Sequence, residues 1–164
     1  MNKKNKIKII RTVTVPQSIC FFEEVMIRMK DAGYETLVVT SAGKELEEFK
    51  QRNPKAQTIE VPMERHISPI KDIKSLWQMV KVMRKERPYI VHSMTPKAGL
   101  ITMLAAWITG VPVRIHTFTG LVWPTTSGLK RKILMTTDWI TCACASHIIP
   151  EGQGVLNDLK NHKI

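Results

Sequence analysis

Acidic side chains are missing from two long stretches of this 164-residue sequence. No Asp or Glu occurs before Glu23 and none occurs between Glu86 and Asp138, while the whole chain carries a formal net charge of +11. A site built from these stretches is expected to be electropositive and to suit phosphate-bearing ligands or anionic lipid headgroups. Nucleic acid fits less well, because only 6% of the residues are aromatic and no known nucleic-acid-binding motif is present.

The sequence also lacks a hydrophobic run long enough to cross a membrane. The longest uncharged stretch, residues 98–113, is interrupted by two glycines and a proline, whereas a membrane-spanning helix needs about 20 apolar residues. A buried helix is therefore expected there. Lys8 and Arg11 interrupt the apolar segment at residues 7–15, so no secretory signal is expected and we predict a cytoplasmic protein.

Cysteine is scarce, with only Cys20, Cys142 and Cys144 in the chain. An odd number of cysteines does not fit a disulfide-bonded scaffold and indicates a reducing compartment. Cys142 and Cys144 would point to one face of a strand, but no second pair of metal ligands lies near them in the sequence. Small buried thiols are therefore the better interpretation, and no metal site is expected.

The motifs of several enzyme classes are absent. Residues 14–18 follow the first predicted strand without a G-x-G-x-x-G, which disfavours a nicotinamide or flavin cofactor, and the chain has no P-loop, Ser/His/Asp set or HExxH helix. Glycoside hydrolysis usually needs two carboxylates, and the predicted strand ends offer none before Glu151. Transfer from a phosphate leaving group fits better, because it depends on positive charge and oriented dipoles.

Strand patterns alternate with helix patterns along the chain. Alternating βαβ units of this kind predict one α/β domain over residues 1–164, a doubly wound, Rossmann-like, mostly parallel sheet of about six strands with helices on both faces. The third helix is expected to bury a stripe of Ile73, Leu76, Trp77, Val80 and Met83. Strands are predicted at residues 7–15, 35–40, 57–61, 89–93, 113–118 and 145–149, and helices at 18–33, 44–52, 68–85, 95–110, 129–139 and 155–160.

In such a sheet the ligand crevice lies beyond the carboxyl ends of the strands, where the first and fourth strands adjoin. This rule indicates three loops, at residues 15–18, 93–97 and 117–121. From the first two we expect phosphate or acceptor contacts by Pro16, Gln17, Ser18, Ser93, Thr95 and Lys97. The second loop opens a helix whose N-terminus attracts anions, although Thr95 could equally serve only as its cap.

The third loop brings an imidazole and hydroxyls beside a glycine. His116 and Gly120 share one side of an extended chain and Thr119 lies on the other, so both sets are not expected to face the crevice together. Gly120 allows the backbone to approach a ligand closely. His116 and Thr119 are the candidate catalytic residues, and a structural role for His116 remains the alternative.

Four segments of the sequence resemble the amino-terminal domain of retaining GT-B glycosyltransferases of family four. They are Glu-Arg-Pro-Tyr-Ile-Val-His at 86–92, Pro-Lys-Ala-Gly at 96–99, Thr-Gly-Val-Pro-Val at 109–113 and Thr-Phe-Thr-Gly-Leu at 117–121. The chain departs from the family pattern in the first loop, where Val15-Pro16-Gln17-Ser18 stands in place of a glycine-rich segment, and at three further positions. Thr119 stands where a histidine is frequent, Tyr89 where an aspartate is common, and Met94 where a second histidine often occurs.

The resemblance implies a two-domain enzyme that moves a sugar from a nucleotide-sugar donor to a lipid-linked or polysaccharide acceptor in capsule or O-antigen synthesis. It also implies a retaining reaction that needs no metal or other cofactor. The carboxyl-terminal domain that grips the nucleotide is absent from this chain, so the chain alone is expected to be inactive. Two other hypotheses remain open: a non-catalytic acceptor-binding or membrane-binding subunit that partners a separate catalytic chain, and half of a sugar-nucleotide epimerase.

Basic residues could hold such a domain at the inner face of a membrane. Each lysine or arginine near an anionic surface contributes about 1 kcal/mol. A solvated charged face is the alternative interpretation. The clusters are Lys3, Lys4, Lys6 and Lys8; Lys81, Arg84 and Lys85; and Lys130, Arg131 and Lys132.

Overall fold

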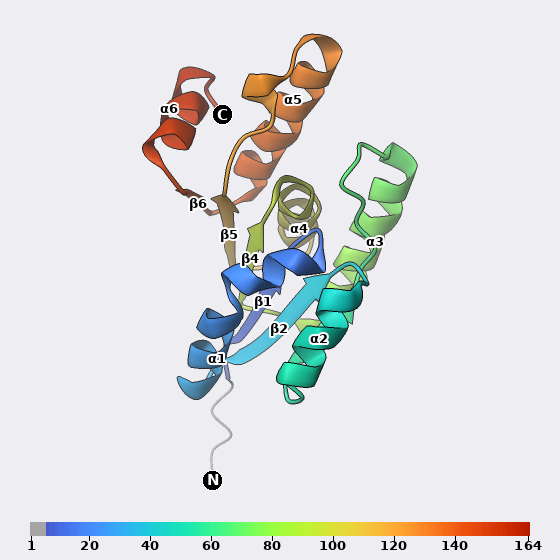
Figure 1. Cartoon of the computed structure of the whole chain (residues 1–164). Coiled ribbons are helices and arrows are strands. Elements are labelled where there is room, and N and C mark those ends of the chain that lie inside the picture. Colours follow the sequence, from blue (N-terminus) through green and yellow to red (C-terminus); the bar gives the residue numbers. More distant parts are fainter. Residues whose placement is uncertain (1–5) are drawn as a thin grey trace.

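The computed structural model describes residues 6–164, which form one parallel sheet with helices on both faces (Figure 1). The spatial order of the strands is β3-β2-β1-β4-β5-β6. The strands are β1 (Lys8–Thr12), β2 (Glu35–Thr40), β3 (Gln57–Glu60), β4 (Ile90–Met94), β5 (Val113–Phe118) and β6 (His147–Pro150). The predicted fold class is confirmed, and β1 lies between β2 and β4 as expected.

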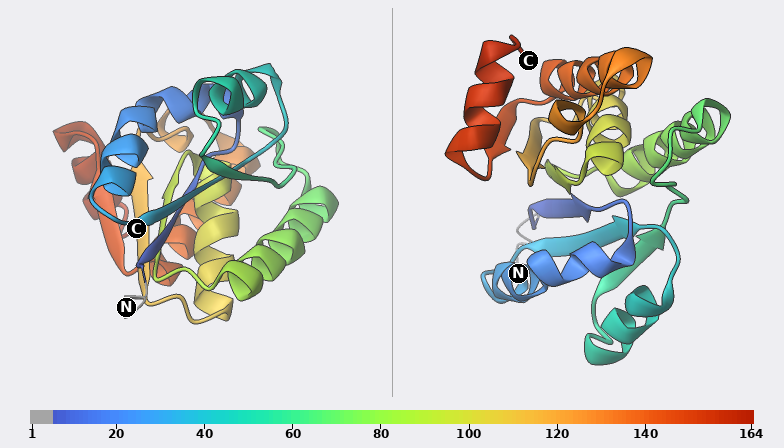
Figure 2. Two further views of the ribbon diagram at one scale, coloured as in Figure 1. Left: turned by 90° about the horizontal axis from the view of Figure 1, so that it is seen from below. Right: turned by 45° about the horizontal axis from the view of Figure 1, so that its top comes forward.

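Helices cover both faces of the sheet (Figure 2), and an apolar core lies beneath them on each face. One face carries the 3-10 helix η1 (Pro16–Phe21) with α1 (Glu23–Asp31) and α2 (Lys44–Arg52). The other carries α3 (Pro69–Glu86), α4 (Pro96–Ile108) and α5 (Gly128–Cys144). The short 3-10 helix η2 (Trp123–Thr125) precedes α5, and α6 (Gln153–Asn161) follows β6.

The segment after β1 differs from the prediction of one helix over residues 18–33. Pro16 begins a 3-10 helix at once, and α1 starts only at Glu23. Ser18 is buried inside η1 and does not cap a helix, because proline at the first position already fixes the backbone of that turn. The predicted start of this helix at residue 18 was therefore wrong.

The last two cysteines lie in a helix and not on a strand. Helix α5 continues to Cys144, beyond the predicted end at residue 139. Cys144 is buried against the core of α3 and α4, while Cys142 is half-buried, and all three cysteines are free thiols. Within residues 6–164 no three His, Cys, Asp or Glu side chains form a group that could hold a metal ion.

Helix α3 buries only part of the stripe predicted for it. Val80 and Met83 are in the core, but Ile73 is 57% exposed and Trp77 is 59% exposed. The buried side of α3 instead runs through Ser75, Met79, Val80 and Met83, and Ile73 and Trp77 lie on the exposed side of the helix. The prediction of burial was therefore wrong for Ile73 and Trp77.

The basic clusters have different surroundings. Lys8 lies 2.8 Å from carboxylate oxygens of both Glu35 and Glu86, so it is neutralised at the amino edge of the sheet. Lys3 and Lys4 lie outside the residues that the structure describes. The side chains at 81, 84, 85, 130 and 132 are exposed.

Candidate functional site

A cavity of about 460 Å³ opens at the carboxyl edge of the sheet, next to the ends of β1 and β4. It lies where the switch point between these strands was predicted to place a ligand. Two of the three expected loops meet there, together with the β3–α3 loop and the first turns of α5. The lining residues are Thr14, Val15, Ser18, Arg65, His66, Ile67, Thr95, Pro96, Lys97, Val122, Lys130 and Leu134.

Two threonines join the loops after β1 and β4 at the floor of the cavity. The backbone N–H of Thr14 donates to Thr95 Oγ1 at 3.0 Å, and the two hydroxyl oxygens are 2.8 Å apart. The N–H of Ala98 donates to Thr14 Oγ1 at 3.1 Å, so the first turn of α4 is capped by Thr14 from the segment after β1. Thr95 makes no side-chain cap, contrary to one of the two alternatives, and its φ of 79° is one that residues other than glycine rarely adopt.

Lys97 was expected to meet a phosphate, but its ammonium group already has protein partners. Its Nζ donates to Asp72 Oδ2 at 2.5 Å and to the carbonyl oxygen of His66 at 2.9 Å. The side chains of Lys97 and Asp72 are only 11% and 19% exposed, so this ion pair is well shielded from water. The positive charge of Lys97 is therefore largely neutralised within the protein.

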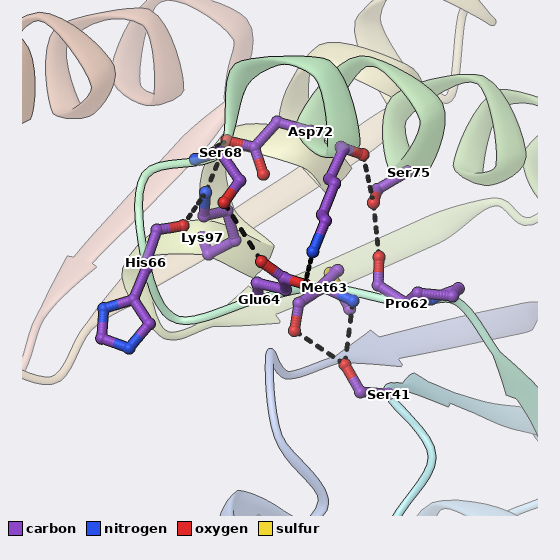
Figure 3. Close-up of polar contacts among 10 residues, drawn as sticks. Ser41, Pro62, Met63, Glu64, His66, Ser68, Asp72, Ser75 and Lys97 are labelled. Carbon is purple, nitrogen blue, oxygen red and sulfur yellow. Dashed lines mark hydrogen bonds and ion pairs between the residues drawn. The ribbon is translucent and has the colours of Figure 1, made fainter.

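The wall formed by the β3–α3 loop is fixed by contacts to its main chain (Figure 3). Ser41 Oγ donates to the carbonyl oxygen of Met63 and accepts from the N–H of Met63, both at 2.9 Å. Ser75 Oγ donates to the carbonyl oxygen of Pro62, and Lys97 holds that of His66. This segment is consequently a fixed part of the site and not a loose connection.

Three side chains of the cavity keep their hydrogen-bonding groups available. Arg65, His66 and Lys130 form no side-chain hydrogen bond or ion pair with any of residues 6–164. The imidazole of His66 points away from the Lys97 network (Figure 3). The sequence prediction missed Arg65 and His66, because it considered only loops at the switch point, although the loop after β3 ends at the same edge of the sheet.

His116 lies inside the protein and not in the cavity. It is 1% exposed, its Nδ1 is 2.8 Å from Ser93 Oγ, and its ring packs edge-on against Phe118. A Cβ at Gly99 would lie 2.4 Å from its Cε1, so the helix and the imidazole are in direct contact. Burial lowers the pKa of His116 to about 4, which keeps the ring neutral at pH 7.

A second imidazole, half-buried, lies on the other face of the same two strands. His92 Nε2 is 2.7 Å from Thr117 Oγ1, and burial together with the nearby charge of Arg11 lowers the pKa of His92 to about 3. The guanidinium of Arg11 is itself buried, 4.8 Å from the centre of the Phe22 ring, and burial lowers its pKa to about 10. Neither His92 nor Arg11 lines the cavity.

The remaining predicted site residues lie in the cavity wall, in the buried interior or on the outer surface. Ser18 lines the cavity, whereas Gln17 is exposed and donates to Glu45 at 2.8 Å, and Pro16 packs against Gly43. Thr119 and Gly120 are exposed beyond β5 but do not line the cavity, to which the segment after β5 contributes only Val122. The catalytic assignments of His116 and Thr119 stay predictions.

Comparison with known proteins identifies several similar chains. The model of the glycosyl transferase 4-like domain family matches residues 21–153. A capsular polysaccharide biosynthesis glycosyltransferase of Staphylococcus aureus is 38% identical over 157 residues, which are 96% of this chain and 39% of that protein. An Escherichia coli UDP-Gal:alpha-D-GlcNAc-diphosphoundecaprenol alpha-1,3-galactosyltransferase is 33% identical over 88 residues, 52% of this chain and 22% of that protein.

Solved structures share the fold at low sequence identity. A glycosyltransferase of Rickettsia africae superposes with a TM-score of 0.70 at 19% identity, over 98% of this chain and 41% of that one. A UDP-GlcNAc 2-epimerase of Neisseria meningitidis gives a TM-score of 0.68 at 13% identity, over 96% and 43% of the two chains. This chain thus spans less than half the length of each of these four proteins.

Proposed function

We propose that this chain, because it belongs to the family of glycosyl transferase 4-like domains, is the acceptor-side half of a glycosyltransferase of polysaccharide synthesis. The observation that carries the proposal is the cavity at the ends of β1 and β4, lined by Arg65, Lys97 and Lys130 and by no Asp or Glu among the described residues. Such a site suits an acceptor that carries phosphate. The site also lacks the pair of carboxylates that a glycosidase needs. The capsular relative supports the same class of reaction.

The donor in this proposal is a nucleotide sugar and the acceptor a lipid-linked saccharide. The name of the Escherichia coli relative contains both, a UDP-sugar and a sugar on a polyprenyl diphosphate. The donor-binding half belongs to sequence outside these 164 residues, since relatives of this chain are more than twice its length. Transfer with retention of configuration and without a metal ion is part of the proposal.

The proposal includes contact with an anionic membrane at the inner face. Ile70, Ile73 and Trp77 are 86%, 57% and 59% exposed and follow one side of α3, and Lys81 and Arg84 continue that side. Apolar side chains beside lysine and arginine are typical of helices that rest on a lipid surface. None of the helices within residues 6–164 is both long and apolar enough to span a bilayer.

A chimeric enzyme tests the proposed function. In the chimera this chain replaces the matching segment of the Staphylococcus aureus capsular relative, and transfer of labelled sugar from UDP-sugars to bacterial lipid-linked saccharides is measured. We expect transfer by the chimera and none by the 164-residue chain alone. A folded chimera that transfers nothing contradicts the proposal.

The same assay separates the two alternative functions. At 13% sequence identity, the similarity to the epimerase shows only that the two proteins share a fold. Conversion of the UDP-sugar to its epimer by the chimera, without transfer, favours the epimerase hypothesis. Co-purification of this chain with a separate transferase, whose activity requires it, favours the non-catalytic acceptor-binding subunit.

A further inference from the structure

The charges around the cavity do not balance within the protein. Two carboxylates on the segment that carries Arg65 and on the start of α3 are both engaged: Glu64 binds Lys71 and the hydroxyl of Ser68, and Asp72 binds Lys97. Arg65 and Lys130 consequently face the cavity with no carboxylate partner among residues 6–164, and His66 adds an unpaired imidazole. Two uncompensated cations that share one concave site favour an anion with more than one charge.

These groups come from opposite walls of the cavity. Arg65 and His66 are on the β3–α3 loop, whose main chain is fixed by Ser41, Ser75 and Lys97. Lys130 is on the first turn of α5. An anion between the two walls could therefore be contacted from both sides, which suits a diphosphate better than a single carboxylate.

Apolar side chains continue from both walls toward solvent. Ile67 is 46% exposed and Ile70 is 86% exposed on the α3 side, while Val122 is 46% and Leu129 is 74% exposed on the α5 side. The first turns of α3 and α5 both project past the carboxyl edge of the sheet (Figure 1), and the cavity is lined by residues of α5 and of the loop that leads into α3. The site thus has a basic cavity with apolar side chains beside it. A ligand that joins a multiply charged group to a hydrocarbon chain matches this arrangement.

We propose that Arg65, His66 and Lys130 bind the diphosphate of a polyprenyl-diphosphate acceptor, and that the prenyl chain leaves the cavity between the exposed apolar residues of α3 and α5. This inference rests on the proposed function and names its acceptor-binding residues. Lys97, the cation most strongly indicated by the sequence, instead positions the loop that carries Arg65 and His66.

Binding of farnesyl diphosphate to the 164-residue chain, measured by calorimetry, tests the assignment. Arg65→Gln and Lys130→Gln should each weaken binding by about tenfold or more, because each removes a charge-assisted hydrogen bond. Arg28→Gln is the matched control, since Arg28 is 77% exposed on α1 and pairs only with Glu24 among the described residues. Equal binding by all three variants and the unchanged chain overturns the proposal.

Two further ligands distinguish the source of the phosphate. Vesicles of phosphatidylglycerol should bind Arg65→Gln and Arg28→Gln to the same extent, and a loss specific to Arg65→Gln means that the cavity serves lipid headgroups. UDP should not displace farnesyl diphosphate at comparable concentration, and displacement means that the cavity serves the donor. Either result overturns the assignment.

A separate substitution tests the exposed apolar residues between which the prenyl chain is proposed to leave the cavity. Ile70→Ser should weaken binding of farnesyl diphosphate several-fold while leaving binding of inorganic pyrophosphate unchanged, because it removes only hydrocarbon contact. Ile108→Ser, 46% exposed on α4, is the control. In the chimeric enzyme, Arg65→Gln should raise the acceptor KM. Transfer with an unchanged acceptor KM would refute this inference and leave the proposed function intact.

Discussion

Replacing Gly99 with alanine tests the contact between helix α4 and the buried imidazole of His116. In an isolated helix the exchange of glycine for alanine stabilises by about 1 kcal/mol. Here the new Cβ would lie 2.4 Å from Cε1 and 2.9 Å from Nδ1 of His116, distances at which one of the two groups must move. The imidazole has little room to move, because it is 1% exposed and held by Ser93 and Phe118.

The two effects have opposite signs, and the steric one should dominate. Overpacking a closed core costs about 1–3 kcal/mol, so Gly99→Ala should lower the free energy of unfolding by about 1–2 kcal/mol in urea titrations followed by circular dichroism. In a His116→Ala background the same exchange should become stabilising by up to about 1 kcal/mol, because the obstacle is gone. Gly154→Ala on α6 is the control, since nothing lies within 4 Å of a Cβ there. An equal loss from Gly99→Ala in both backgrounds would refute the packing argument.

Two other perturbations follow from buried charges. Burial raises the pKa of Asp138 from 3.8 to about 6 in the folded chain, so its contribution to stability is full only below pH 3.8 and is lost as the pH rises from there through about 6. The free energy of unfolding of wild type relative to Asp138→Asn should therefore fall by about 2 kcal/mol between pH 4 and 7, and a constant difference would contradict this. Asp72→Asn leaves the shielded ammonium of Lys97 without its counter-charge and should cost about 3 kcal/mol in urea unfolding. Glu64→Gln at a 44% exposed side chain should cost less than about 1 kcal/mol, and similar losses for both would argue against the shielding.

The order of the elements could be predicted from the sequence because each is encoded locally. The β-branched run around Ile9 and Ile10 identifies a strand buried on both faces, and Pro69 and Pro96 lie in the first turn of their helices. Once the elements alternate, the handedness of βαβ units leaves few arrangements. The edge of the sheet where the cavity lies could therefore be predicted as well.

The composition of the cavity could not be predicted, because it depends on pairings between distant residues. Lys97 and Asp72 are 25 positions apart, and nothing in the local pattern at Lys97 shows that an ion pair neutralises its charge. His116 occupies a strand-end position typical of a ligand-binding residue, but its register turns it toward Gly99. Trp77 follows a helical core pattern and is nevertheless exposed, because the side of α3 that packs on the core runs through Ser75, Met79 and Met83.

The side chains that hold the β3–α3 loop hydrogen-bond only to its main-chain atoms. These atoms are the N–H and carbonyl of Met63 and the carbonyls of Pro62 and His66. Every amino acid except proline supplies these same atoms. The residue types at positions 65–67 can consequently change without loosening the wall that presents them. Substitutions at these positions can therefore alter what the cavity contacts while the wall keeps its place.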